Sequence, residues 1–329
     1  MIRIIVFTII CSGILYAQQI ENKNILTLDE AIRRALENNY ELKLKRNDLR
    51  KAEAELKEAE RLPNPKMNYS NEFLKDNSVD VGEKSLTGTL PVNFLWERWK
   101  NISSKEGKYE AEKNLELDQI RITNYNTAKA YIELYYSLGL GNQYKSIKNE
   151  IERITVTSKT RLEMGDISEY EHKRILFASA KLSAVQNESI MQKQNKLNQL
   201  MLITGIDNQD YEMENVPLQE YPSANIDELY KTALDNRPDY KAALLAIESS
   251  EDAISYEKSR IIPAINLGLG YKKVTPNIKG TILQIDFDIP LFNRNQKEIE
   301  SAIIEQNKVN AEMFLLKNKI KTELSGSLK

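Results

Sequence analysis

Between Pro91 and Pro217 the chain contains no proline, and its apolar residues recur at alternating steps of three and four. This heptad-like spacing is typical of helices that pack along a common seam. Gly165 interrupts the pattern and can end a first helix, while Asp166 or Ser168 can cap a second one. We therefore expect a long helical hairpin over residues 96–204. Its seam positions include Leu117, Ile120, Tyr131, Leu134, Leu138, Ile147, Ile151, Ile154, Ile175, Ala178, Leu182 and Val185.

Outside this stretch the hydrophobic period changes from helical to two. Residues 40–62 and 239–262 are rich in Ala, Glu, Leu and Lys and predict helices. After the prolines that end them, apolar and polar residues alternate, which is the pattern of strands with two different faces. We expect one β-hairpin over residues 65–92 and another over residues 263–290.

The clearest alternation is "LQIDFDI" at residues 283–289. It places Gln284, Asp286 and Asp288 on one side of a strand and four large apolar residues on the other. Two interpretations stay open: a sheet of a water-soluble domain with one wet face, or strands of an outer-membrane barrel whose lumen the polar residues face. The predicted strands are too few to close a barrel. Because lipid does not tolerate open strand edges, the second interpretation requires several subunits.

An internal repeat organises the chain. Residues 28–43 and 226–241 align without a gap, and each segment is followed by the same order of helix, proline and alternating strands. We therefore divide the chain into a first repeat, 18–223, and a second repeat, 224–329. Each copy begins with a predicted capping box, formed by Thr27 with Glu30 and by Asn225 with Glu228.

The N-terminus has the pattern of a secretory signal peptide. A basic Arg3 precedes an apolar stretch at 4–16, which is too short to span a bilayer, and Ala17 offers a cleavage point. We expect residues 1–17 to be removed on export. The only cysteine, Cys11, lies inside this segment. The mature chain is then without cysteine, which excludes disulfides, thiolate metal sites and cysteine nucleophiles.

The composition of the chain argues against several further classes of function. The formal net charge is −2, which argues against a nucleic-acid partner because such proteins present a basic face. His172 is the only histidine, so we expect no metal site and no histidine-based catalytic arrangement. Nucleotide-binding glycine motifs are also missing from the sequence. We expect neither an enzyme nor a cofactor.

Three segments, in this order and with the repeat, resemble the TolC-like outer-membrane efflux proteins. They are "LTLDEAIRRALENN" at the start of the first repeat, "PNP" before the first strand, and "RLEMGDISEYE" at the turn of the helical hairpin. The resemblance covers essentially all of the chain after the signal peptide. The segment "RLPNPKMNYSNEF" is most similar to the heavy-metal-efflux branch.

The resemblance implies a mainly α fold with a small β part, in which each protomer gives four membrane strands and long coiled-coil helices to a trimeric α/β-barrel duct. It implies a passive conduit in the cell outer membrane, with its helical part in the periplasm, serving tripartite efflux or type I secretion. The implied partners are two further copies of the chain, outer-membrane lipid, a periplasmic adaptor and an inner-membrane pump. The implied adaptor-docking residues at the hairpin tip are Arg161, Leu162, Gly165 and Asp166.

Two alternatives remain beside this interpretation. A periplasmic adaptor would also combine export, a helical hairpin and β segments, although adaptors usually carry one hairpin in a compact β-rich module. The second repeat, moreover, reaches only the start of its long helix in residues 294–329. By comparison with the first repeat we expect the chain to be C-terminally truncated, and a non-functional fragment is the other alternative. The transported substrate is not encoded in any of these patterns.

Overall fold

The computed structural model describes residues 24–77, 79–206, 211–214, 225–275 and 277–327. The predicted signal peptide, 1–17, lies outside the described residues. The chain divides into two compact units, which are described separately below. The first consists of Met1–Tyr40 and Arg121–Glu220, and the second of Glu41–Ile120 and Tyr221–Lys329. The units therefore differ from the two sequence repeats: beyond the predicted signal peptide the first unit lies within the first repeat, whereas the second unit takes residues from both sides of the boundary at 223.

Helices account for most of the described residues, as predicted. They are α1 (Leu28–Asn38), α2 (Tyr40–Ala59), α3 (Phe94–Glu163), α4 (Glu169–Thr204), α5 (Ile226–Asn236), α6 (Pro238–Ser259) and α7 (Gln296–Ser327). The strands are β1 (Asn24–Leu26), β2 (Lys66–Asn71), β3 (Lys75–Asp76), β4 (Val79–Asp80), β5 (Glu83–Pro91), β6 (Tyr211–Met213), β7 (Ile265–Val274) and β8 (Ile278–Phe287). Among these helices, none is long and apolar enough to cross a bilayer.

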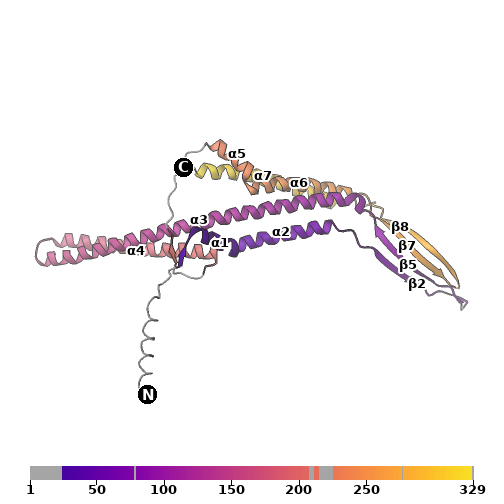
Figure 1. The fold of residues 1–329 in the computed structure, drawn as a ribbon, viewed down its shortest axis with the longest axis horizontal. Helices are drawn as coiled ribbons and strands as arrows, with labels where there is room; N and C mark the ends of the chain where they lie inside the picture. The colour runs from indigo at the N-terminus through magenta and orange to yellow at the C-terminus, as the bar shows by residue number, and fades with distance from the viewer. Residues whose placement is uncertain (1–23, 78, 207–210, 215–224, 276, 328–329) are drawn as a thin grey trace, which may run out of the picture. The chain divides into compact units, whose positions relative to one another are not determined.

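The first unit contains the helical hairpin formed by α4 and the second part of α3 (Figure 1). Where the hairpin begins, α1 and the short parallel ladder of β1 with β6 pack against it. Tyr131 is fully buried there, and its hydroxyl donates to the backbone oxygen of Leu26 at 2.7 Å. The same hydroxyl lies 3.4 Å from the backbone oxygen of Glu214, so one side chain links α3 to both strands at the C-terminal end of the ladder. The surrounding core consists of Leu26, Ala31, Ala130, Leu134, Leu200 and Ile206.

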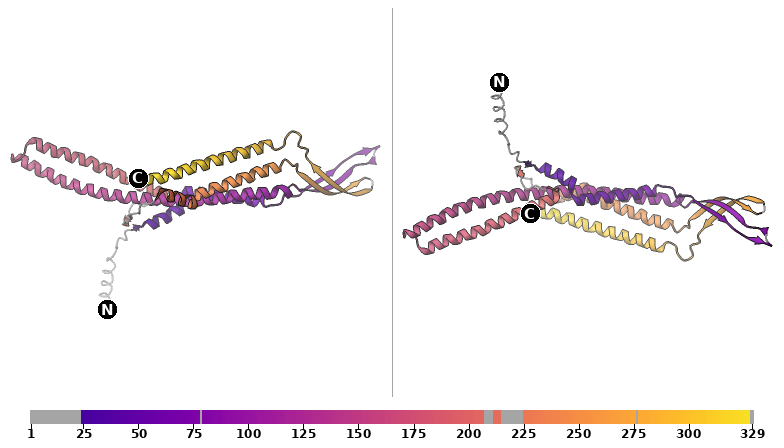
Figure 2. Two further views of the ribbon diagram at one scale, coloured as in Figure 1. Left: turned by 90° about the horizontal axis from the view of Figure 1, so that it is seen from above. Right: turned by 90° about the horizontal axis from the view of Figure 1, so that it is seen from below.

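The second unit contains α2, α5, α6, α7, the first part of α3 and a four-stranded antiparallel sheet (Figure 2). The strand order is β2-β5-β7-β8, so the two predicted hairpins pair with each other through β5 and β7. A small antiparallel ladder of β3 with β4 extends the first hairpin. β7 and β8 have 10 residues each and β5 has 9, whereas β2 has only 6.

Two different seams attach helices to the first part of α3. On the α2 side, Lys105 and Lys108 both bind Glu55, with nitrogen–oxygen distances of 3.1 and 2.8 Å, and Arg46 binds Glu116 at 3.1 Å. These ammonium groups, Lys108 first, lower the pKa of the Glu55 carboxyl.

On the α6 side of α3 the residues are small. The hydroxyls of Ser104 and Ser249 each donate to the other residue's backbone oxygen, at 3.2 and 2.8 Å. A Cβ on Gly107 would lie 3.0 Å from the Ser249 Cβ, so the two helices approach closely at this point.

The repeat is visible in the elements. α1 and α5 have 11 residues each, and each is followed directly by a longer helix. Thr27 accepts a hydrogen bond from the backbone nitrogen of Glu30, which is one half of the predicted capping box, while the Glu30 carboxylate binds Arg33 and Arg34. The predicted box at Asn225 differs, because its side chain accepts from Asp227 and not from Glu228. Asparagine carries its oxygen further from the backbone than threonine, and here it bonds the nitrogen two residues ahead.

Candidate functional site

The tip of the helical hairpin is built by two capping motifs in succession. Gly165 has φ +80°, and its backbone nitrogen donates to the Leu162 oxygen at 3.0 Å. The Asp166 nitrogen donates to the Arg161 oxygen at 2.8 Å. This pair of bonds is the Schellman motif, in which a left-handed residue lets the last turn of a helix close on itself. Gly165 therefore ends α3, as its position in the sequence predicts.

Ser168 begins α4 as its N-cap, which decides between the two candidates from the sequence. The Ser168 oxygen accepts from the Glu171 backbone nitrogen at 3.2 Å, and the Glu171 carboxylate accepts from the Ser168 nitrogen at 2.9 Å. This complete capping box satisfies helix nitrogens that would otherwise have no partner. The hydrogen bonds from the Ser168 backbone and hydroxyl lower the pKa of the exposed Glu171 carboxyl.

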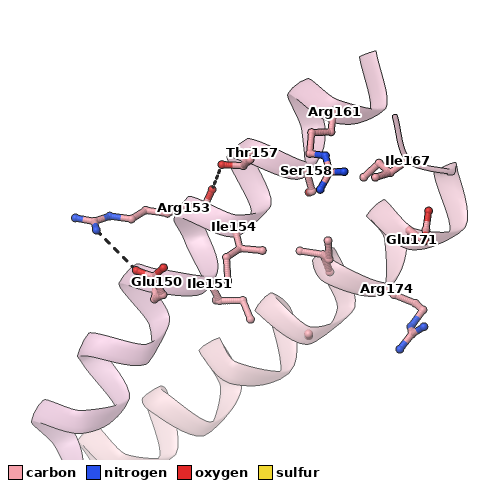
Figure 3. Close-up of a pocket in the computed structure, with 12 residues that line it drawn as sticks. Glu150, Ile151, Arg153, Ile154, Thr157, Ser158, Arg161, Ile167, Glu171 and Arg174 are labelled. Carbon is pink, nitrogen blue, oxygen red and sulfur yellow. Dashed lines mark hydrogen bonds and ion pairs between the residues drawn. The ribbon is translucent and has the colours of Figure 1, made fainter. Parts of the chain in front are cut away.

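Behind this turn, a groove of about 590 Å³ lies between the two arms of the hairpin. Figure 3 shows Ile151 and Ile154 on α3 pointing toward α4. Ile167 comes from the turn itself. These positions continue the predicted seam, so the groove is where the seam opens near the tip. Its remaining lining residues are Glu150, Arg153, Thr157, Ser158, Arg161, Glu171, Arg174, Ile175 and Ala178.

One side-chain bond joins the two arms at the groove. The Ser158 hydroxyl, which is almost fully buried, lies 2.8 Å from His172 Nδ1 and 2.8 Å from the Thr155 backbone oxygen. The carbonyl oxygen can only accept, so the hydroxyl proton goes to it. His172 Nδ1 must then carry the hydrogen that the hydroxyl oxygen accepts. The only histidine of the chain thus connects α4 to α3.

The four predicted docking residues share the tip but have different positions. Arg161 is exposed and lines the groove, whereas Leu162 is half-buried and gives its carbonyl to the turn. Gly165 and Asp166 are exposed at the turn itself. The isoleucines of the groove are absent from the sequence-predicted set, although their heptad spacing marks them as seam residues. Spacing alone does not show where a seam is open.

A second candidate surface is the four-stranded sheet of the second unit. Its register puts Leu269 opposite both Gly88 and Leu283, and Leu267 opposite both Leu90 and Ile285. Directly opposed residues lie on the same face of a sheet. One face is consequently apolar across all four strands and exposed: it carries Met67, Tyr69, Leu86, Leu90, Leu267, Leu269, Tyr271, Leu283, Ile285 and Phe287.

The opposite face of the sheet is polar and rich in small residues. Gln284 lies opposite Gly268, and its amide donates to Asp286 at 2.9 Å. Asp288 follows the end of β8 and is not in the ladder. A Cβ on Gly270 would lie 2.6 Å from Thr87 Oγ1, so glycine is required where this face is most crowded. Gln284 and Asp286 thus share the polar face, as predicted, and Asp288 lies beyond it.

In the part of the chain that the structure describes, there is no group of three or more His, Cys, Asp or Glu side chains that could hold a metal ion.

Comparison with known proteins shows which sequences and folds this chain is similar to. No family profile matches the chain. It is 22% identical over 292 residues to the cobalt-zinc-cadmium resistance protein CzcC of Cupriavidus metallidurans, which covers 87% of this chain and 68% of CzcC. Crystal structures with the same fold include the CmeC outer membrane channel of Campylobacter jejuni, with a TM-score of 0.73 and 16% identity over 88% of this chain and 67% of CmeC. CusC matches with a TM-score of 0.72 and 17% identity, over 91% of this chain and 73% of CusC.

Proposed function

We propose that this chain, which has the fold of the TolC-like outer-membrane channels, is the exit duct of a tripartite efflux system. The resemblance found in the sequence and the mainly α fold class with its small sheet are confirmed by the comparisons. The single observation that carries the function is the sheet of the second unit, with one apolar and one polar face.

The apolar face fits a lipid environment. Leu283 is 80% exposed and Leu269 is 69% exposed, and the two lie directly opposite each other on neighbouring strands, with Leu267 and Ile285 as the next pair on this face. A soluble domain would cover such a contiguous apolar surface. Exposed aromatic residues flank it, with Tyr69 and Tyr271 toward the hairpin ends and Trp99 where α3 begins. Aromatic girdles of this kind mark the two interfaces of membrane barrels.

The polar face then lines a lumen, and the assembly is a closed oligomer, which we take to be the trimer that the resemblance implies. Within the described residues β2 and β8 are the edges of the four-stranded sheet. Open edges are too costly in lipid, so β8 of one copy pairs with β2 of the next until the barrel closes. Gln284 and Asp286 face the lumen in this arrangement, and the Asp286 carboxylate favours cations there.

The hairpin tip docks a periplasmic adaptor. The groove offers isoleucines framed by Arg161, Glu171 and Arg174, which suits an amphipathic helix with charged flanks. α3 has 70 residues, which at about 1.5 Å each give a contour length on the order of 100 Å. A helix of this length carries the tip well into the periplasm.

The proposed cargo is divalent metal ions. It follows from the similarity to CzcC, whose name describes resistance to cobalt, zinc and cadmium. The chain acts as a passive conduit without catalysis, and an inner-membrane pump supplies the driving force.

Leu283→Lys and Gln284→Lys test the orientation of the sheet, because they place the same charge on opposite faces of β8. A lysine on the lipid face costs about 2–4 kcal/mol at mid-bilayer, whereas an exposed position on a soluble sheet tolerates it within about 0.5 kcal/mol. We expect the chain and Gln284→Lys in detergent-extractable outer membranes, and Leu283→Lys to be strongly depleted there. Release of all three by osmotic shock would instead support the adaptor alternative.

Transport is tested separately in a host that lacks its own duct but retains a metal pump and adaptor. Intracellular zinc and cadmium should fall when the chain is expressed, and should not fall with a variant carrying Ile151→Asp and Ile154→Asp in the groove. Unchanged metal content with the wild-type chain correctly inserted in the outer membrane would refute the metal-efflux part.

A further inference from the structure

We propose that Lys84, Lys273 and Lys279 form a binding row for phosphate groups of membrane lipids, and this inference rests on the proposed membrane function of the sheet. The register places Lys84 directly opposite Lys273, and Lys273 directly opposite Lys279. The three residues therefore form one row across β5, β7 and β8. We refer to them as the lysine row.

The lysine row lies on the apolar face of the sheet. Lys273 is two residues from Tyr271 on β7, and side chains two apart on a strand point the same way. The row before it, toward the helices, contains Tyr69, Leu86 and Tyr271 in direct register. One step of two residues corresponds to about 7 Å along a strand. The ammonium groups thus follow immediately after the tyrosines that end the apolar surface.

Such a row is unfavourable without a counter-charge. Neighbouring strands are about 4.8 Å apart, and like charges directly opposite each other repel. All three lysines are exposed, and no ion pair joins any of them to another described residue. Lys272 provides the contrast: it is on the polar face and forms an ion pair with Glu83. Lys272 is thus neutralised by Glu83 on the same face, whereas the three lysines of the row have no such partner among the described residues.

The occupant that fits is a phosphate-bearing lipid headgroup. Tyrosines at the edge of an apolar surface lie at the level of lipid headgroups, and lysines next to them extend outward to the phosphates. The row continues a surface that already faces acyl chains, so one lipid can satisfy both the apolar face and the charges. Basic clusters beside a membrane surface select anionic lipids in this way.

The experiment measures lipid retained by the full chain. Protein purified from outer membranes in mild detergent is analysed by native mass spectrometry, then titrated with vesicles of phosphatidylcholine alone or mixed with phosphatidylglycerol. The variant Lys84→Gln, Lys273→Gln, Lys279→Gln is compared with a control, Lys51→Gln, Lys181→Gln, Lys321→Gln, which removes the same charge from helices. Each lysine near an anionic surface contributes about fivefold to binding, so we expect the row variant, which lacks three, to bind anionic vesicles roughly a hundredfold more weakly.

The outcomes separate this proposal from the proposed function. Retained phospholipid or phosphorylated glycolipid in the wild type and the control, lost in the row variant, supports the lysine row. Equal retention by the row variant, with all proteins in the outer membrane, overturns the row and leaves the duct intact. Displacement of the bound lipid by inorganic phosphate, or an anionic protein co-purifying in its place, overturns lipid as the occupant. Recovery of the wild type in the osmotic-shock fluid overturns both proposals.

Discussion

Replacing Gly165 with alanine isolates the conformational requirement of the hairpin tip. Gly165 has φ +80°, and an added Cβ would have no atom within 4 Å. The substitution therefore introduces no clash, and its effect comes only from the backbone. Because a left-handed conformation costs an L-residue about 1–2 kcal/mol, and alanine recovers about 0.4–1 kcal/mol by restricting the unfolded chain, the net destabilisation is about 1 kcal/mol.

Gly139 offers a matched control within the same helix. It lies inside α3, and a Cβ there would also meet nothing within 4 Å. Its conformation is helical, so Gly139→Ala should stabilise α3 by about 1 kcal/mol through helix propensity. The same chemical change is thus expected to have opposite signs at two positions that are equally free of steric contact.

The assay is hydrogen exchange of the two variants, followed by mass spectrometry of peptides around each site. A change of about 1 kcal/mol alters the local opening equilibrium about fivefold. Peptides that contain residues 160–170 should lose protection in Gly165→Ala, and peptides around residue 139 should gain it in Gly139→Ala. Effects of the same sign at both sites would refute the assignment of Gly165 to a required left-handed turn.

Two further predictions concern the first unit. Tyr131→Phe leaves the carbonyl groups of Leu26 and Glu214 without their shared donor. The free energy of local opening should fall by about 1–2 kcal/mol, so amide exchange of β1 and β6 should accelerate. Unchanged exchange would show that water replaces the phenol. For Glu171 the folded pKa is lowered from 4.5, so its stabilisation of the α4 start is present above pH 4.5 and disappears as the pH falls through the folded pKa. Protection factors at the start of α4 should decrease in that range, and Glu171→Gln should abolish the pH dependence.

The long-range organisation was predictable from the sequence where one periodicity dominates. The seam of apolar residues predicted arms of the helical hairpin at 96–204, and α3 and α4 occupy nearly this range. Gly165 predicted the turn because only glycine fits a left-handed position readily. The alternation after Pro263 likewise predicted β7 and β8, since a buried or lipid-facing side requires period two.

Features that depend on pairing between distant segments were not predictable. β1 and β6 are three residues each and pair across most of the first repeat, so neither carries a pattern of its own. The lysine row exists only through register, because a shift of one residue would send its members to different faces. Ser158 and His172 are 14 residues apart, and only the closed hairpin brings them together.

The two seams of α3 should respond differently to ionic strength. The α2 side is joined by partly exposed ion pairs of Glu55 and Glu116, whose attraction is screened over about 8 Å at physiological salt. The α6 side is joined by serine hydroxyls and close backbone contact, and there the charged Asp252 accepts from the Ser103 hydroxyl and not from a cation. At high salt the attachment of α2 to α3 should therefore weaken, while α6 stays attached to α3. The ionic strength around the protein would then decide how freely α2 moves relative to α3.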